Sequence, residues 1–506
     1  MTGSLTTTGA STSPPSATTL NSRPCSSNTS QSLPTKRNIL PAALLLACVA
    51  LFAGATQPKH DFRGAWIQTI FQGYDKRSTA ENKAYLTGLL DQLESAGINA
   101  VIFQVRPRSD AFYQSTIEPW SASLTGKYGK APEPFWDPLE FMVSECHKRG
   151  MELHAWLNPY RGPATGEVLP ASHPMRRHPE RFVRYGKTHY YEPSLKANRD
   201  HICRIVADIL TRYDVDGIHF DDYFYPYPIA KEQFPDAEAY RRAHTGLSKA
   251  DWRRRNVDLL IEQVSRTIAD VKPWVRFGIS PFGIWRNASS DPRGSNTRGL
   301  QNYDDLYADV PRWAANGLID YQIPQLYWEI GHKAAPYDVL CHWWAENGHG
   351  RHVYIGQDAE KTAKFNELSR KLSLAEAHRD GCIRGNCWWY AASLPTTIAS
   401  ELRNGAYRTK ALVPEYLWKS VEPAARPTPE ADGDRIIWHP DPTARRWVIY
   451  RFNSVAEVDT ENPEAICGVT YMPQWHADRP GVYVITALDF ANSESLPSKP
   501  IEFKDK

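Results

Sequence analysis

The sequence predicts a (β/α)8 barrel of the TIM type followed by a small all-β sandwich domain. Between residues 61 and 412, eight short apolar runs typical of strands alternate with segments that carry helix start and stop signals. After Pro414 this alternation gives way to short strand-like runs separated by Pro, Gly and Asn. A doubly wound sheet is the alternative for the first domain, but that fold is expected to carry a nucleotide-binding loop, and neither G-x-G-x-x-G nor a P-loop is present.

Residues 1–55 have the pattern of an export leader. A Ser-, Thr- and Pro-rich stretch ends in Lys36-Arg37, the apolar run 39–53 follows, and Ala53-Gly54-Ala55 supplies the small residues of a cleavage site. The run is too short for a membrane-spanning helix, which needs about 20 residues. We therefore expect an exported protein of the periplasm or cell envelope. The alternative is an outer-membrane lipoprotein modified at Cys48, and membrane anchoring is expected only in that case.

The eight strand-like runs of the barrel domain, 61–412, can be taken in chain order. They are 62–69, 100–107, 152–160, 217–225, 276–283, 321–328, 352–357 and 386–391. Three of the helices between them have clear starts. Ser78 and Glu81 have the spacing of a capping box, Asp137-Pro138 offers an N-cap with Pro at the first helical position, and Ser248 begins another capping box before a long amphipathic run.

The second domain, residues 425–503, is predicted to be a β-sandwich. Its strand-like runs are 436–438, 447–452 and 482–489, with turn residues between them. The stretches 446–451 and 483–489 resemble a fibronectin type III module. We expect an accessory role for this domain and assign it no catalytic residue.

Composition and charge limit the classes of partner. Lys and Arg total 59 against 57 Asp and Glu, a net charge of +2, so we expect no nucleic-acid partner. Aromatic residues make up 12% of the chain and include 17 Trp. Some of these rings fill cores, whereas exposed rings can stack on the apolar faces of sugars.

The cysteine and histidine spacings favour neither a metal nor another cofactor. Cys382 and Cys387 are spaced C-x4-C without a second pair nearby, and the sequence has no H-E-x-x-H or H-x-H motif. The cysteines that follow the leader allow many disulfide pairings, and the sequence selects none.

In a barrel, catalytic groups lie at the carboxyl ends of the strands. The fourth run, 217–225, contains the clearest set of polar side chains. Ile218 and Phe220 point outward because side chains alternate along a strand, so His219 and Asp221 point into the barrel mouth. Asp222 begins the following loop and is a further candidate.

The same alternation in other strands directs polar and aromatic side chains to the same mouth. The second, third and sixth runs contribute several of them, and neighbouring loop residues add more. The residues expected to bind substrate are Gln104, Arg106, Trp156, Asn158, Tyr160, His219, Tyr223, Gln325, Tyr327, Trp328 and Asp358.

Glycoside hydrolysis uses two carboxyl groups across a cleft, one to protonate the leaving oxygen and one to attack or to activate water. The predicted pair is Asp221 and Glu329. Asp221, held by Arg106 and His219, is the expected nucleophile or base. Glu329 is the expected acid, kept protonated where Tyr327 and Trp328 exclude water, and Asp358 is the alternative acid or a stabiliser of the transition state.

Several of these stretches together resemble a bacterial glycosyl hydrolase-like family that was long filed as a domain of unknown function. The stretches are Phe62-Arg63-Gly64-Ala65-Trp66, Gln104-Val105-Arg106-Pro107, Ala155-Trp156-Leu157-Asn158-Pro159-Tyr160, 216–223 and Pro324-Gln325-Leu326-Tyr327-Trp328, and the resemblance covers about 61–400. It implies exported enzymes of cell-envelope glycan turnover, with a cell-wall polysaccharide, the peptidoglycan glycan strand, as the leading substrate.

The fourth-strand motif Asp216-Gly217-x-His219-x-Asp221 also resembles, more remotely, that of α-amylase-type enzymes. Those enzymes have Arg at the position of His219, and their last Asp is the nucleophile, which supports Asp221. They also have a Glu in the fifth strand, and 276–284 contains none.

Two rival hypotheses stay open. A metal-dependent hydrolase could use Asp221, Asp222 and His219 as ligands. A non-catalytic glycan-binding protein of the envelope would use the same aromatic residues for adhesion.

Overall fold

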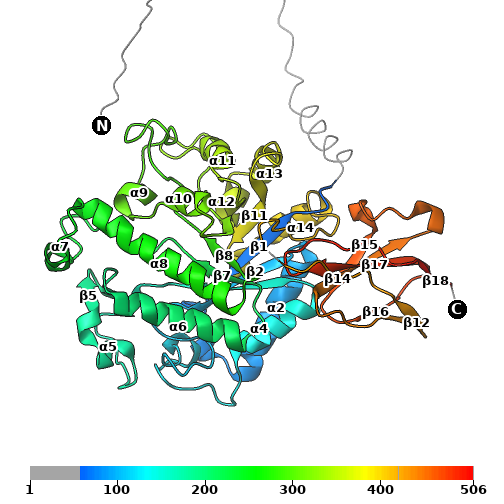
Figure 1. Ribbon diagram of the computed structural model, residues 1–506, viewed down its shortest axis with the longest axis horizontal. Coiled ribbons are helices and arrows are strands. Elements are labelled where there is room, and N and C mark those ends of the chain that lie inside the picture. Colours follow the sequence, from blue (N-terminus) through cyan, green and yellow to red (C-terminus); the bar gives the residue numbers. More distant parts are fainter. Residues whose placement is uncertain (1–56, 420, 505–506) are drawn as a thin grey trace, which may run out of the picture. The chain divides into compact units, whose positions relative to one another are not determined.

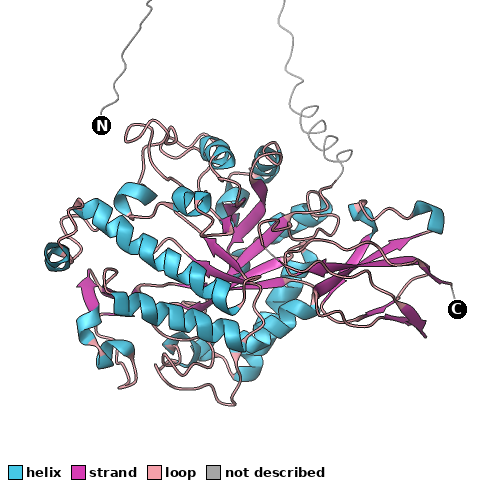
Figure 2. Ribbon diagram, in the orientation of Figure 1, coloured by secondary structure: helices cyan, strands magenta, loops and turns pink. Residues whose placement is uncertain are grey.

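The computed structural model describes residues 57–419 and 421–504, so the predicted leader, its cleavage site and Cys48 lie outside the described residues. Eight parallel strands close into a barrel in the order β1-β11-β10-β9-β8-β7-β3-β2, at the centre of Figure 2. The predicted fold class is confirmed. The barrel strands are β1 (Phe62–Ile67), β2 (Ala100–Arg106), β3 (Glu152–Leu157), β7 (Gly217–Phe220), β8 (Arg276–Ile279), β9 (Tyr321–Gln322), β10 (His352–Asp358) and β11 (Ile383–Trp389).

Several strands are shorter than the sequence predicts at their carboxyl ends. The sixth was expected to run over 321–328, but β9 ends at Gln322. Beyond it, the backbone of Gln325 forms isolated bridges to Phe282 and Gly356 and is not part of a strand. The predicted runs included residues of the loops that follow the strands. The aromatic and apolar side chains of these residues continue the strand-like sequence pattern, although their backbone is no longer part of the sheet.

Helices surround the strands, and α6 and α8, drawn in green, pack side by side across the view of Figure 1. Their buried residues recur at helical spacing, as Ile202, Ile205, Val206 and Ile209 do on α6. The helices are α2 (Thr79–Ser95), α3 (Ala122–Thr125), α4 (Pro138–Lys148), α5 (Pro174–Arg177), α6 (Lys196–Arg212), α7 (Ala237–Ala243), α8 (Lys249–Val271), α9 (Asn302–Asp305), α10 (Val310–Ala315), α11 (Tyr337–Glu346), α12 (Ala359–Lys364), α13 (Leu368–Glu376) and α14 (Thr396–Asn404).

The three predicted helix starts are confirmed. Ser78 and Glu81 form a complete capping box at α2. The Asp137 carboxylate accepts the amides of Leu139 and Glu140 at α4, and Ser248 accepts the amide of Asp251 at α8. Each cap satisfies amide groups that the first helical turn leaves without partners.

A small sheet that the sequence analysis did not predict enlarges the loop after β3. It contains β4 (Arg161–Ala164), β6 (Thr188–Tyr191) and β5 (Phe182–Tyr185) in that order, all antiparallel. The helix α5 and the 3-10 turn η2 (Pro179–Arg181) connect β4 to β5.

The C-terminal part contains two antiparallel sheets. The first has the order β12 (Glu430–Asp432), β13 (Arg435–Ile437), β16 (Gln474–His476), and the second has the order β15 (Ile466–Thr470), β14 (Ala444–Phe452), β17 (Gly481–Asp489), β18 (Ile501–Phe503). On β14, Trp447 and Ile449 pack with Trp438 in a core between the sheets, whereas Val448 and Tyr450 pack with Leu412 on the other face. Both faces of the second sheet are therefore buried.

Ion pairs join these sheets to the amino-terminal end of the barrel. The Glu152 carboxylate, at the start of β3, lies 2.8 Å from the Arg446 guanidinium of β14 and 3.4 Å from that of Arg276, and it accepts the Asn492 amide at 3.0 Å. Beside it, Asp216 lies 2.8 Å from Arg445. Because an unpaired buried charge is costly, the barrel end depends on these arginines.

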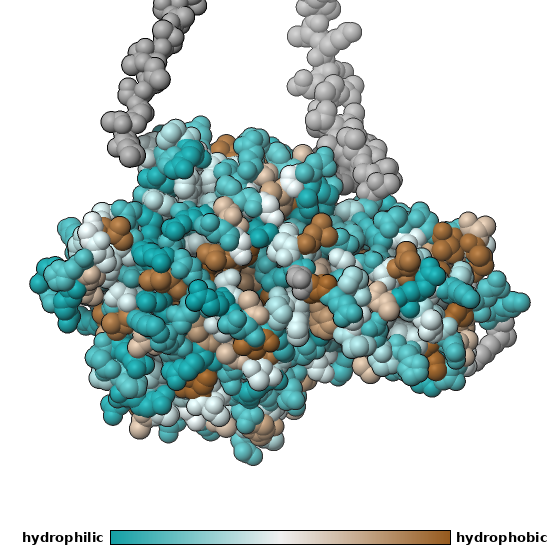
Figure 3. Space-filling view, viewed as in Figure 1, coloured by the Kyte–Doolittle hydropathy of each residue, from teal (hydrophilic) through white to brown (hydrophobic). Residues whose placement is uncertain are grey.

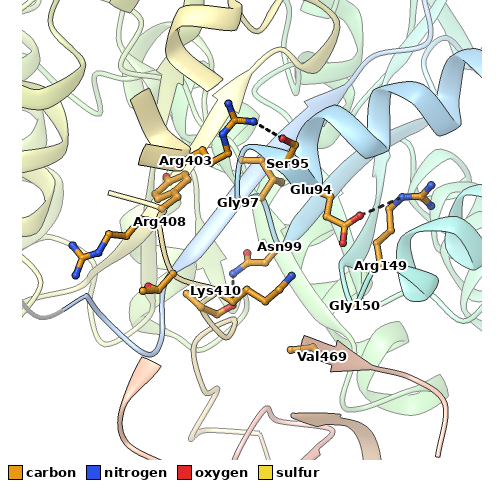
Figure 4. A pocket seen from close by; sticks show the side chains of 14 residues that line it. Glu94, Ser95, Gly97, Asn99, Arg149, Gly150, Arg403, Arg408, Lys410 and Val469 are labelled. Atoms are coloured by element: carbon orange, nitrogen blue, oxygen red, sulfur yellow. Dashed lines mark hydrogen bonds and ion pairs between the residues drawn. The ribbon is translucent and has the colours of Figure 1, made fainter. Parts of the chain in front are cut away.

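A cavity of about 180 Å³ lies near this junction, where α2, the chain after α14 and Val469 of β15 meet (Figure 4). Arg403 reaches across it to the Ser95 hydroxyl, and Asn99 donates to the Ala411 carbonyl. This cavity is at the end of the barrel opposite to the strand carboxyl ends, because Asn99 precedes β2.

On the face shown in Figure 3, hydrophobic residues are scattered among hydrophilic ones. Within residues 57–419 and 421–504, no helix has both the length and the apolar character that crossing a membrane requires. The six cysteines in these ranges, Cys146, Cys203, Cys341, Cys382, Cys387 and Cys467, are free thiols.

The junction predicts a specific loss of stability. Arg446→Met leaves the Glu152 carboxylate with one fewer cation in a buried site, and we expect the free energy of unfolding to fall by about 3 kcal/mol in urea denaturation. Arg435→Met, which removes an exposed pair with Asp432, is the control and should change it by less than about 1 kcal/mol. Equal effects of the two variants would contradict a structural role of this junction.

Candidate active site

A cavity of about 330 Å³ opens at the carboxyl ends of the barrel strands. Its walls combine aromatic and polar side chains, and two adjacent carboxyl groups lie in it. The lining residues are Trp66, Gln68, Ile70, Phe71, Gln104, Trp156, Arg161, Asp221, Asp222, Tyr223, Ser280, Gln325, Tyr327 and Trp389.

Asp221 follows the last residue of β7 and is only 5% exposed. Its Oδ2 accepts hydrogen bonds from the Asn158 amide and from Trp156 Nε1, the latter at 3.3 Å, and its Oδ1 accepts the Tyr223 amide at 3.3 Å. Burial, together with the charge of Asp222, raises the pKa of Asp221 to about 7 despite these donors. Asp221 therefore titrates near neutral pH.

Asp222 is buried beside it. Its carboxylate accepts the Tyr227 hydroxyl and, at 3.2 Å, the Gln325 amide, which also donates to the Ser280 carbonyl. Burial raises the pKa of Asp222 as well. Because the two carboxyls interact strongly, their protons belong to the pair, and the pair retains a proton near neutral pH.

Part of the predicted substrate-binding set does meet at this cavity. Gln104, Trp156, Tyr223, Gln325 and Tyr327 line it. Asn158 lies directly behind them: its side-chain nitrogen donates to Asp221, and its Oδ1 accepts from Gln104 at 3.0 Å. Alternation along β2 and β3 therefore placed Gln104, Trp156 and Asn158 at the mouth as the structure does.

Arg106 and His219 do not hold Asp221, contrary to expectation. Arg106 forms two 2.7 Å hydrogen bonds with the buried carboxylate of Glu118. His219 lies deeper in the barrel, where its ring nitrogens meet the Ser280 hydroxyl at 3.0 Å and the Tyr321 hydroxyl at 3.2 Å. Uncharged donors surround Asp221 instead.

Glu329, Trp328, Asp358 and Tyr160 do not line the cavity. The inward direction predicted for Glu329 assumed that the strand runs through residue 328, but β9 ends at Gln322. Glu329 lies instead in a turn, where its backbone carbonyl accepts the amides of His332 and Tyr337. Trp328 packs edge-on against Phe282, and Asp358 caps α12.

Tyr160 is fully buried in the core around the barrel. Of the described residues that line the cavity, only Asp221 and Asp222 carry carboxyl groups.

The described residues contain no group of three His, Cys, Asp or Glu side chains arranged to hold a metal ion. The ligand set that the sequence suggested for a metal, Asp221, Asp222 and His219, is not brought together, because His219 does not line the cavity and both its ring nitrogens have protein partners.

Residues 61–371 match the family described as "Glycosyl hydrolase-like 10". The chain belongs to this family. It is 36% identical to glycosyl hydrolase YngK of Bacillus subtilis (strain 168) over 493 residues, which cover 88% of this chain and 94% of that protein. It is 41% identical to glycosyl hydrolase DigH of Escherichia coli (strain K12) over 318 residues, 58% of this chain and 72% of that protein.

Among solved structures, the chain is similar to the glycoside hydrolase domain of PgaB (BpsB) from Bordetella bronchiseptica. The identity is 13%, the TM-score is 0.46, and the match covers 68% of this chain and 98% of that one. With the family membership, the two curated relatives identify the chain as a glycosyl hydrolase.

Sequence reasoning did not place several lining residues of this glycosyl hydrolase in the site. Trp66 of β1 contacts Trp389 of β11 edge-on, with 6.1 Å between the ring centroids. Alternation along β1 could have predicted that Trp66 points into the barrel. Arg161 begins the inserted β4 and lies 5.5 Å from the Tyr223 ring centroid. No sequence pattern indicated Arg161, because the inserted sheet itself was not predicted.

The contact between Asn158 and Asp221 predicts a direction of pKa change. Asn158→Ala removes a donor that stabilises the charged carboxylate, so the pKa of Asp221 should rise above that of the wild type. The measurement is a pH titration of ¹³C-labelled aspartate carboxyls by NMR. Asn347→Ala, far from the carboxyl pair on the end of α11, should leave that titration unchanged, and an unchanged or lower pKa in Asn158→Ala would refute the assigned contact.

Proposed function

We propose that this glycosyl hydrolase cleaves O-glycosidic bonds in a cell-wall polysaccharide, the glycan strands of peptidoglycan, as an exported enzyme of the periplasm or cell envelope. One observation carries the catalytic part of this proposal: two adjacent, buried carboxyl groups with raised pKa values lie in an open, aromatic-lined cavity at the barrel mouth. Perturbed carboxyl groups in such a cavity are a recurrent property of catalytic sites.

The Asp221–Asp222 pair supplies both protonation states that hydrolysis needs. The protonated member donates its proton to the leaving glycosidic oxygen, and the C–O bond to the anomeric carbon breaks. The ionised member stabilises the positive charge that develops on the sugar ring, and water completes the reaction by adding at the anomeric carbon. The proton that water loses restores the pair.

Aromatic rings around the pair give the cavity its affinity for sugar faces. Trp389 contacts both Trp66 and Trp156 edge-on at 6.1 Å, and it lies over Tyr327 at 6.4 Å. At the rim, Phe71 is 81% exposed, so an apolar ring faces solvent beside the opening. Exposed rings of this kind suit a polymer that extends beyond the cavity.

Export is supported by the leader pattern of residues 1–55, and the substrate class by the resemblance of 61–400 to enzymes of envelope glycan turnover. Cleavage after Ala55 gives a periplasmic or cell-envelope enzyme, whereas lipidation at Cys48 gives an outer-membrane lipoprotein. The C-terminal sheets of three and four antiparallel strands have the sandwich architecture to which fibronectin type III modules belong, which supports that identification of residues 425–503.

Substitution of the pair tests the reaction. We expect Asp221→Asn and Asp222→Asn each to lower kcat on isolated peptidoglycan glycan strands by about 10³-fold, because each removes a member of the pair. Binding to the same strands in a pull-down assay should persist. Glu329→Gln is the matched control, and it should retain activity because Glu329 does not line the cavity.

Two results would change the assignment. If the wild type is inert on these strands yet binds them as tightly as both variants, the glycan-binding hypothesis holds and the enzymatic proposal on this substrate is wrong. If Glu329→Gln loses activity and Asp222→Asn does not, the pair inferred from the sequence, Asp221 with Glu329, replaces the adjacent one.

The raised pKa of Asp221 predicts how activity depends on pH. Because the reaction needs a proton on the pair, activity should fall as pH rises through about 7. Tyr227→Phe removes a donor to the ionised Asp222, so the pair should bind its proton more tightly and this alkaline limb should move to higher pH. The measurement is kcat against pH with glycan strands, and a limb that moves to lower pH in Tyr227→Phe would contradict it.

A further inference from the structure

A second cavity, of about 320 Å³, lies on the inserted segment after β3, and it shares no lining residue with the active-site cavity. It is formed by α5, η2, the last residue of β6, the middle of α6 and residues 116–117. Figure 1 labels α5 at the lower left, with α6 beside it. Its lining residues are Thr116, Ile117, Pro174, Arg177, His178, Arg181, Tyr191, His201 and Arg204.

The lining carries three guanidinium groups and no carboxyl group. Arg177 donates to the Ile117 carbonyl at 3.3 Å, and Arg204 lies 3.3 Å from His201 Nδ1. Within the described part of the chain neither has an ion pair with a carboxylate, and Arg181 lies 3.9 Å from its nearest one, Glu180. Arg177 and Arg204 therefore carry charges that no described carboxylate neutralises, whereas Arg181 is paired with Glu180, and we expect the cavity to attract anions.

The floor of the cavity is fixed in place. The His201 side chain is 5% exposed and lies 2.9 Å from Glu118, and Tyr191 donates to the same Glu118 oxygen at 3.1 Å. Arg106 holds Glu118 from the other side at 2.7 Å. Because these groups are buried and already partnered, they form a rigid base, and the exposed side chains of Arg177 and Arg204 lie over it.

The inserted sheet separates this cavity from the catalytic one. Tyr190 and Tyr191 are successive residues of β6, so their side chains point to opposite faces. Tyr190 pairs in register with Arg161, which lines the active site, whereas Tyr191 lines the second cavity. A ligand held here would not occupy the position of the scissile sugar.

We propose that this cavity binds a phosphate group. Guanidinium forks match the oxygens of oxyanions, and these three come from three separate elements: Arg177 from α5, Arg181 from η2 and Arg204 from α6. A tetrahedral phosphate offers enough oxygens to receive donors from all three directions, whereas a carboxylate offers two. The phosphate is either free or carried as a diester on an envelope polymer.

Isothermal titration calorimetry of the full chain with inorganic phosphate, at constant ionic strength in chloride, tests this site. We expect one saturable site. Arg204→Gln and Arg177→Gln should each weaken binding by about tenfold or more, because each removes a charged hydrogen-bonding group. Arg176→Gln, the neighbouring exposed arginine on α5 that does not line the cavity, is the matched control and should bind as the wild type does.

Further measurements decide the assignment. Binding of dimethyl phosphate as tight as that of inorganic phosphate supports a diester on a polymer, and its failure to bind supports free phosphate. Acetate that binds as tightly as phosphate would overturn the preference for a tetrahedral ion. No saturable phosphate binding to the wild type, or equal weakening by Arg176→Gln and Arg204→Gln, would overturn the site itself. None of these variants touches the Asp221–Asp222 pair, so the result does not depend on the proposed reaction.

Discussion

The buried ion pair between Arg106 and Glu118 is the contact on which the mouth of this barrel depends. Although burial opposes ionisation, the charge of Arg106 and the hydrogen bond from His201 hold the pKa of Glu118 well below its usual range. Arg106 also donates to the carbonyls of Asn158 and Pro159 at 2.6 and 3.0 Å. One charge pair thereby fixes the end of β2, the end of β3 and the start of the inserted segment.

The Arg106–Glu118 pair positions residues of both the active-site cavity and the second cavity. On one side, the anchored backbone of Asn158 presents its amide to Asp221. On the other, Glu118 fixes Tyr191 and His201 beneath the arginines. Arg106, which was expected to hold Asp221 directly, is thus a positioning residue that acts on Asp221 through Asn158. Because Glu118 takes the charge of Arg106, Arg161 is the cation that lines the cavity of Asp221 and Asp222, and burial still raises the pKa values of both carboxyls.

The fold and about half of the predicted site were readable from the sequence for the same physical reason. Alternation along β2 and β3 predicts the placement of Gln104 and Trp156, and Asn158 continues it just past the end of β3. The pairing of β2 with β3 shifts register between Gln104 and Arg106, so the rule does not extend to Arg106. β9 is only two residues long, so alternation could not predict the direction of Glu329, which does not line the cavity.

The sequence did not indicate which charged side chains pair with one another. Nothing in the spacing of Arg106 indicates that Glu118, from the following loop, takes its charge in place of Asp221. The inserted sheet was missed because its strands are only four residues long and one includes a Gly-Pro step.

The ion pairs at the opposite end of the barrel bear on the order in which the chain can fold. Glu152 and Asp216 belong to its first half, whereas Arg445, Arg446 and Asn492 are among the last residues to be synthesised. A chain released at residue 412 would contain every barrel strand but would leave these carboxylates without those partners. The barrel end therefore acquires its full set of ion pairs only once the C-terminal sheets have been made, although Glu152 keeps Arg276 and Asp216 keeps His147 within the barrel domain itself.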